Sequence, residues 1–200
     1  LLASEGYVQN FFNYWADVLR AQSQGVAGST TSLNYLNYLR AALRENKPYD
    51  QIARELVSSE GSCFDTGAIG YYMRDRGMPL DNLSNTTRIF LGTRMECAQC
   101  HDHPFDKWTQ KQFYEMAAFT HNMSASSYRS KSGDEVQKMI RNDKSLDNDT
   151  RDLMRQALNE ATRSLRDTLV VQNKGQLRLP HDYKYKDAKP KDVVQASVMF

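Results

Sequence analysis

The spacing of apolar positions along the chain predicts a fold built mainly from α-helices. Apolar residues recur every three or four positions, as on one face of an amphipathic helix. This pattern covers six segments: residues 4–20, 33–45, 51–59, 81–94, 109–120 and 148–169. Ser4 is suited to cap the first helix, and Thr109 with Gln112 forms a capping-box pair at the start of the fifth. We therefore expect a mainly α, multi-helix domain.

Two of these helices have a stripe of apolar residues that we expect to be buried. In the first helix the stripe is Tyr7, Phe11, Tyr14, Trp15, Val18 and Leu19. In the last it is Met154, Leu158, Ala161, Leu165 and Leu169. We expect the last helix to pack on its own domain rather than on a partner protein.

Residues between the helices include the Gly, Pro and polar clusters that are typical of loops. Pro48 is expected to end the second helix, and Asp50 to cap the third. Irregular loops are predicted at residues 25–32 and 124–135, and a short helix near residues 71–75. Residues 176–200 have Pro and Lys breaks between short alternating stretches, which predicts a short extended C-terminal tail with a strand or two.

The composition is that of an ordinary globular protein, with 40% hydrophobic and 25% charged residues. The formal charge of +2 gives no basis for a nucleic-acid partner or an anionic membrane surface. No apolar run approaches the roughly 18 residues of a membrane span. The first residues, LLASEGYVQNFF, lack the features of a signal peptide. We expect a single domain over residues 1–200 that is a fragment of a longer protein.

The candidate chemistry lies in one short stretch, MECAQCHDHPFDKW, at residues 95–108. It contains two of the three cysteines and two of the four histidines. C-x-x-C-H is the attachment signature of c-type haem. Two thiols three positions apart lie on one turn of backbone, so Cys97 and Cys100 can each form a thioether to the same macrocycle. His101 would then be the proximal iron ligand, with its other ring nitrogen donating to a backbone carbonyl.

Zinc is the main alternative for the same residues. Cys97 and Cys100 can supply two thiolates, and His101 or His103 a third ligand. We take His103 as the third ligand of this alternative. A structural zinc site needs four ligands, usually from two pairs, and the chain has no second pair. The isolated candidates for the fourth position are Cys63, His121 and His181. The expected role of Cys63 is that of a small buried apolar residue.

A thioredoxin-like redox dithiol is a third reading of the same cysteine pair. It expects a strand–helix–strand context, which the pattern does not predict. The sequence therefore leaves haem, zinc and dithiol open, with haem preferred.

The opposite face of a haem would need a ligand from another part of the chain. His103 cannot be that ligand, because two residues span at most about 7 Å between Cα atoms. The distal candidates are Met78, Met116, Met123 and His121. An iron without a distal ligand would instead have an open face for small-ligand or peroxidase-like chemistry. We expect the haem pocket to include Phe105, Trp108 and Met116.

The stretch RDRGMPLDNLSNTTRIFLGTRMECAQCHDHPFDKWTQKQFYEMAAFTH resembles the planctomycete-type cytochrome domain. LLASEGYVQNFFNYWADVLR, NYLRAALRENKPYDQIARELVSSEG and LPHDYKYKDAKPKDVV are similar to the flanking blocks of that domain. This is a domain of unknown function in large exported multidomain proteins. The haem motif core would cover about residues 80–123, and residues 130–170 are the least family-like part.

The resemblance implies an exported parent protein with further domains before and after this one. It carries over Cys97, Cys100 and His101 as the haem motif. His103, Pro104, Phe105, Asp106 and Trp108 match the usual continuation of that motif.

The expected function is therefore extracytoplasmic electron transfer by a covalently bound haem c, in the periplasm or an exported protein. The expected partners are a redox protein or other domains of the same parent chain. An electron carrier is preferred to a catalyst. The alternatives are a zinc-stapled interaction domain without a redox role and a haem enzyme with an open distal face.

Overall fold

The structure is a computed structural model that describes residues 4–22, 29–127, 131–163, 167–171 and 175–198. Most of these residues are helical, which confirms the expected fold class. The chain divides into two compact units. Unit 1 comprises Leu1–Arg74 and Ala125–Val170, and unit 2 comprises Asp75–Ser124 and Val171–Phe200. The described helices include none that is long and apolar enough to cross a membrane.

Unit 1 begins with three α-helices: α1 (Glu5–Val18), α2 (Ser29–Arg44) and α3 (Tyr49–Val57). A 3-10 turn, η1 (Gly67–Ile69), leads directly into the short helix α4 (Gly70–Met73). Ser4 caps α1 as expected, since its hydroxyl accepts from the Tyr7 N–H at 3.2 Å. The prediction that Asp50 caps α3 is wrong. Pro48 precedes Tyr49 as the N-cap, and Asp50 lies in the first turn, where its charge favours the helix dipole.

Two glycines allow η1 and α4 to pack tightly against α2. A Cβ at Gly67 would lie 2.2 Å from the Asn34 carbonyl oxygen, and one at Gly70 would lie 2.3 Å from the Tyr35 Cβ. Real Cβ contacts are never this short, so both positions require glycine. The close approach lets Tyr35, Ile69 and Tyr71 become almost fully buried.

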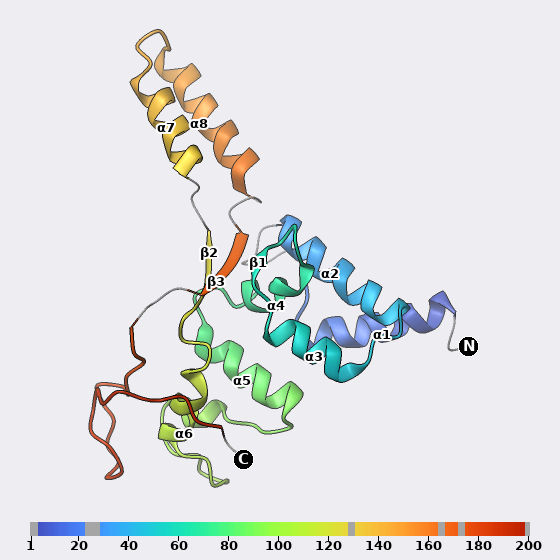
Figure 1. The fold of residues 1–200 in the computed structure, drawn as a ribbon, viewed down its shortest axis with the longest axis vertical. Helices are drawn as coiled ribbons and strands as arrows, with labels where there is room; N and C mark the ends of the chain where they lie inside the picture. The colour runs from blue at the N-terminus through green and yellow to red at the C-terminus, as the bar shows by residue number, and fades with distance from the viewer. Residues whose placement is uncertain (1–3, 23–28, 128–130, 164–166, 172–174, 199–200) are drawn as a thin grey trace. The chain divides into compact units, whose positions relative to one another are not determined.

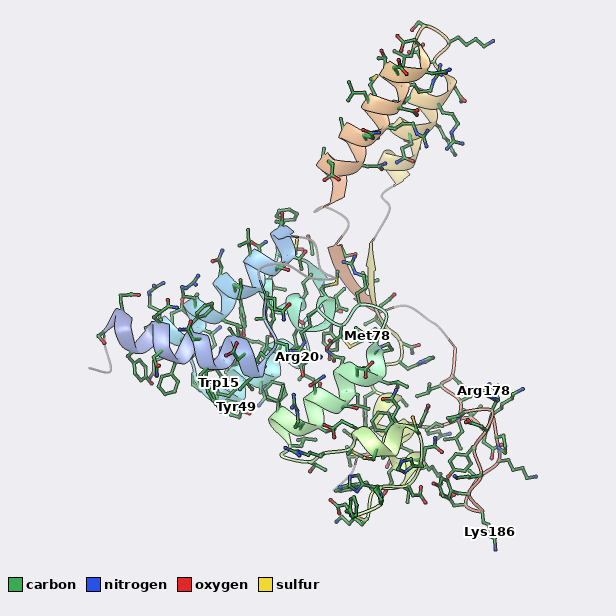
Figure 2. All side chains as sticks on the ribbon, turned by 180° about the vertical axis from the view of Figure 1, so that it is seen from behind. Trp15, Arg20, Tyr49, Met78, Arg178 and Lys186 are labelled. Carbon is green, nitrogen blue, oxygen red and sulfur yellow. The ribbon has the colours of Figure 1, made fainter. Side chains whose placement is uncertain are left out.

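The buried face of α1 differs from the predicted stripe by about one residue. Val8, Phe12, Ala16 and Leu19 are buried. Phe11 is instead 38% exposed and Tyr14 59% exposed. The two faces have similar apolar content, so periodicity alone could not select between them. Figure 2 shows Trp15 beside Tyr49 of α3, with ring centroids 5.5 Å apart.

Three short strands form one sheet: β1 (Gly61–Ser62), β2 (Met123–Ser127) and β3 (Asp167–Val171). The strand order is β1-β3-β2, and β1 pairs antiparallel with β3 through Gly61↔Leu169 and Ser62↔Thr168. The helix predicted to reach residue 169 therefore ends earlier. Leu169 is buried in β3, where it pairs with Gly61 of β1 and is not part of a helix.

The region between β2 and β3 holds a helical hairpin of α7 (Lys131–Asn142) and α8 (Asn148–Arg163). Figure 1 shows the two helices side by side and antiparallel. The predicted loop over 124–135 is wrong, because it contains most of β2 and the start of α7. Met154 is 42% exposed and Leu158 is half-buried. The apolar stripe predicted for α8 is therefore only partly buried. Leu165 lies outside the described residues.

Unit 2 contains α5 (Pro79–Phe90), the 3-10 turn η2 (Glu96–Gln99) and α6 (Gln110–Ala117). Pro79 occupies the first turn of α5, where a missing N–H costs nothing. The predicted helix over 81–94 is too long at its C-terminal end. Gly92 has a φ of +62°, a left-handed conformation that ends a helix and re-aims the chain. The capping box of Thr109 and Gln112 is confirmed.

The core of unit 2 contains residues from α5, η2 and α6. It consists of Leu83, Met95, Ala98, Trp108, Phe113 and Ala117. The C-terminal tail has a second small cluster of Leu179, Tyr183 and Val194. Tyr114 of α6 packs against both clusters. Within the tail, Arg178 pairs with Val193 in an antiparallel bridge, in agreement with the predicted extended conformation.

Candidate functional site

The period of η2 determines which side chains of the cysteine motif face solvent. In a 3-10 turn, side chains three positions apart lie above one another. Met95 and Ala98 form one such pair, and both are 0% exposed in the core of unit 2. Cys97 and Cys100 form the next pair, and both are exposed thiols outside any disulfide. Two apolar anchors thus hold the turn while it presents two thiols.

The backbone of the motif is held by hydrogen bonds within the same turn. The N–H groups of Cys100 and His101 both donate to the Cys97 carbonyl, at 3.3 and 3.2 Å. The Ala98 N–H donates to the Met95 carbonyl at 2.9 Å. The C-x-x-C-H residues therefore share one compact turn rather than a flexible loop.

The ring of His101 has one nitrogen committed to the backbone. Its Nδ1 lies 2.7 Å from the carbonyl oxygen of Asp102. A carbonyl can only accept, so Nδ1 carries the hydrogen, and Nε2 of the neutral ring holds the lone pair. The ring is exposed. This is the arrangement in which a histidine binds a metal through Nε2 while a carbonyl fixes its orientation.

The ring of His103 has the reverse arrangement. Its Nδ1 accepts from the Phe105 N–H at 3.2 Å, so the neutral ring carries its hydrogen on Nε2. The His103 N–H also donates to the Trp108 carbonyl at 2.8 Å, which closes the loop over residues 103–108. His103 is thus the hydrogen-bonded loop histidine of this turn. Binding a metal would require it to change tautomer and lose the bond to Phe105.

An open depression of about 880 Å³ lies beside the motif. Residues 92–94, Glu96, Cys97, His103 and residues 105–108 line it. Its volume is within the roughly 300–1,000 Å³ of typical cofactor pockets. The lining has two basic side chains, Arg94 and Lys107, and two acidic ones, Glu96 and Asp106. The depression can therefore accept a group that has both an apolar body and charged edges.

Tyrosines on the tail side of the motif have perturbed pKa values. Burial raises the pKa of Tyr114, and the nearby Cys100 thiol and Asp182 carboxylate raise it further. Burial also raises the pKa of Tyr183, as does its hydrogen bond to Asp187 at 2.6 Å. Both phenols are therefore neutral hydroxyls at physiological pH.

The three predicted pocket residues have different environments. Trp108 is buried in the core of unit 2 and is also one of the residues that line the depression. Phe105 is 93% exposed at the edge of the depression. Met116 packs against the core cluster and does not line the depression. The two aromatic residues of the prediction meet at one surface, and the methionine does not.

The predicted distal ligands lie on several elements, and none of them lines the depression. Met78 precedes α5 and is 44% exposed. Met116 is on α6, and His121 and Met123 follow it, all three half-buried. The other two isolated zinc candidates are not among the residues that line the depression either: Cys63 is buried in unit 1, as expected, and His181 is exposed on the tail.

The zinc hypothesis requires several ligand side chains to lie around one metal position. Within the described parts of the chain, no three His, Cys, Asp or Glu side chains are grouped so as to hold a metal ion. Cys97 and His103 share the depression, but Cys100 is not among its lining residues.

The sequence pattern did not predict a role for three residues of the site: Asp102, Gln110 and Tyr185. Asp102 accepts from the Gln110 N–H at 2.8 Å, so its carboxylate caps α6 beside the capping box. The Asp102 N–H donates to the Tyr185 hydroxyl at 2.7 Å. The first contact spans eight residues of the motif loop, so it has no N-cap spacing by which the sequence could indicate it. Tyr185 has no local signal either, because it lies 83 residues from Asp102.

Comparison with known proteins relates the chain to one family. Residues 1–125 match the PSCyt2 family, described as a protein of unknown function (DUF1549). No curated protein and no solved structure matches the chain. The match includes the whole cysteine motif and ends before the α7–α8 hairpin and the tail. The chain therefore belongs to the PSCyt2 family of planctomycete cytochrome-like domains of unknown function.

Proposed function

We propose that this domain binds one c-type haem covalently through Cys97 and Cys100, with His101 as the proximal ligand, and transfers electrons outside the cytoplasm. The observation that carries the proposal is the combined geometry of the motif. One 3-10 turn presents both thiols to solvent, and the adjacent imidazole has its Nδ1 hydrogen-bonded to the Asp102 carbonyl.

The residues of the site fit the attachment chemistry. Each thiol can add across one vinyl group, forming a carbon–sulfur bond while the thiol hydrogen goes to the neighbouring carbon, so nothing is released. Exposure of both sulfurs makes them accessible to such a reaction. His101 can offer the Nε2 lone pair to iron without breaking its hydrogen bond to Asp102.

The depression beside Cys97 is the surface best suited to contact the bound group. Phe105 offers exposed aromatic area, and Arg94 and Lys107 offer positive charge for carboxylates. When bound, haem c supplies a one-electron iron couple, whose potential depends on the axial ligands and on burial. The protein's part is to orient the proximal imidazole and to cover one face.

An exported location follows from the proposal, since the usual attachment machinery for c-type haem works outside the cytoplasm. The partners are then a redox protein or other domains of the parent chain. Electron transfer is the proposed role because the site offers a nitrogen ligand and two attachment points.

The proposal is tested by producing the protein in a host with the c-type maturation machinery. We expect the denatured chain to retain the mass of one haem and to give a reduced-minus-oxidised cytochrome c spectrum. Cys97→Ser and Cys100→Ser should each remove one thioether, and the double variant should carry no covalent haem. Cys63→Ala is the matched control, because this third cysteine is buried in unit 1, and it should retain the haem.

Three results would overturn the proposal. Native protein without covalent haem contradicts attachment. Bound zinc without visible absorption would instead assign the motif to a structural zinc site. A five-coordinate spectrum with peroxide turnover would make the domain a haem enzyme with an open distal face rather than an electron carrier.

A further inference from the structure

Asp102, the residue that follows the C-x-x-C-H motif, is held at three points by three segments of unit 2. Its N–H donates to the Tyr185 hydroxyl at 2.7 Å. Its carboxylate accepts from the Gln110 N–H at the start of α6 at 2.8 Å. Its carbonyl accepts from Nδ1 of His101 at 2.7 Å. The contact that orients His101 thus depends on a residue that is itself fixed from both sides.

Tyr185 reaches this point from a tail that has its own rigid packing. The Leu179 N–H donates to the Asp192 carbonyl at 2.9 Å, and the Val194 N–H to the Leu177 carbonyl at 2.8 Å. The rings of Tyr185 and Tyr183 pack edge to face, with centroids 5.5 Å apart. The hydroxyl of Tyr185 is therefore held in place by the tail before it contacts Asp102.

We infer that Tyr185 is a positioning residue for His101, acting through the backbone of Asp102. The Tyr185 hydroxyl holds the N–H of Asp102, and the Gln110 N–H holds its carboxylate. The peptide plane that bears the Asp102 carbonyl is held on its other side, because the His103 N–H donates to the Trp108 carbonyl at 2.8 Å. The carbonyl then stays within hydrogen-bond distance of the imidazole, and the ring keeps the tautomer with Nε2 available. Tyr185 lies in the tail, beyond residues 1–125 that match the family model, and the cysteine motif lies within them.

The consequence for haem rests on the proposed function, but the consequence for the His101 ring does not. Ring tautomers can be read by nitrogen-15 NMR of the haem-free chain of residues 1–200, in mildly alkaline buffer where imidazole is neutral. We expect His101 to be in the Nδ1–H form and the Asp102 amide to be protected from hydrogen exchange. An Asp102 amide that exchanges at the unprotected rate in the unaltered chain would overturn the inference without any mutation.

Tyr185→Phe removes the acceptor and keeps the ring. Tyr183→Phe is the matched control, because it deletes a neighbouring hydroxyl that bonds to Asp187 instead. We expect Tyr185→Phe to move the His101 population toward the Nε2–H form and to expose the Asp102 amide, while Tyr183→Phe changes neither. If Tyr185→Phe lowers stability but leaves the His101 nitrogen shifts unchanged, Tyr185 only anchors the tail and the inference is wrong.

In haem-loaded protein, the same pair of variants gives a second measurement. Tyr185→Phe should shift the midpoint potential of the haem in a redox titration, because the proximal imidazole loses a fixed hydrogen-bond partner. Tyr183→Phe should leave it unchanged, and an equal shift in both variants would contradict the inference. A chain that binds no haem would refute the proposed function, and the tautomer measurement would still decide the role of Tyr185.

Discussion

His101 and His103 use the same ring nitrogen in opposite senses. Nδ1 of His101 donates to the Asp102 carbonyl at 2.7 Å, whereas Nδ1 of His103 accepts from the Phe105 N–H at 3.2 Å. The first ring has its Nε2 lone pair available for a metal, and the second has Nε2 protonated. Two histidines two residues apart are thus assigned different roles by their backbone contacts.

The two histidines should therefore respond differently to substitution. His101→Ala should reduce the haem content of natively produced protein to background, because the proximal nitrogen is lost. His103→Ala should retain the haem and lower the free energy of unfolding by about 0.5–1.5 kcal/mol, the usual contribution of one hydrogen bond. Haem staining and urea denaturation measure the two effects. Loss of haem in the His103 variant would instead assign this residue a ligand role.

Substitution of the two aromatic residues that line the depression should have different effects on stability. Trp108 is 4% exposed and Phe105 is 93% exposed. Trp108→Ala should cost about 3–5 kcal/mol of stability in the haem-free protein, as expected for a buried aromatic residue. Phe105→Ala should change it by less than about 0.5 kcal/mol. Urea denaturation of both variants measures this, and a large loss in the Phe105 variant would mean that its ring packs in solution.

Gly70 should tolerate no side chain. A Cβ there would lie 2.3 Å from that of Tyr35, which is almost fully buried. Gly70→Ala should therefore destabilise unit 1 by about 1–3 kcal/mol or more through overpacking. Gly6→Ala is the matched control, since its new Cβ would meet only the Ser4 hydroxyl at 3.8 Å. Thermal unfolding should show no loss in the control, and an equal loss in both would contradict the packing argument.

Glu55 of α3 accepts a hydrogen bond from Tyr38 of α2, and this contact should make the stability of unit 1 depend on pH. Burial acts to raise the pKa of Glu55, but hydrogen bonds from Lys47, Tyr38 and Gln51 outweigh it and hold the pKa below its ordinary value. A depressed carboxyl pKa contributes stability that is fully present above the unfolded-state value and is lost as the pH falls through the folded-state value.

Glu55→Gln tests this contribution. We expect the variant to be less stable than the original chain at neutral pH and to approach it at an acidic pH below the folded-state pKa of Glu55, where the carboxyl group is protonated in both states. Urea denaturation at the two pH values measures the difference. A stability difference that is the same at both would show that the charge of Glu55 is irrelevant.

Local sequence predicted most of the helices and the residues of the candidate site. Ser4 and the Thr109–Gln112 pair act as caps because their side chains bond to N–H groups within three residues. The C-x-x-C-H residues have the spacing that places two thiols on one turn. These features depend on neighbours in the chain, so a pattern of residue types is enough to predict them.

The tertiary structure decided what depends on distant neighbours. The buried face of α1 is set by what packs against it, which shifted the face from the predicted Phe11 to Phe12. Residues 167–171 form a strand because β1 offers a partner, and a pairing more than 100 residues apart leaves no local pattern. The tautomers of His101 and His103 likewise follow from backbone atoms positioned by the fold, and Tyr185 reaches Asp102 only through the folded tail. The sequence thus specified the reactive groups, and the fold specified which of their atoms are available.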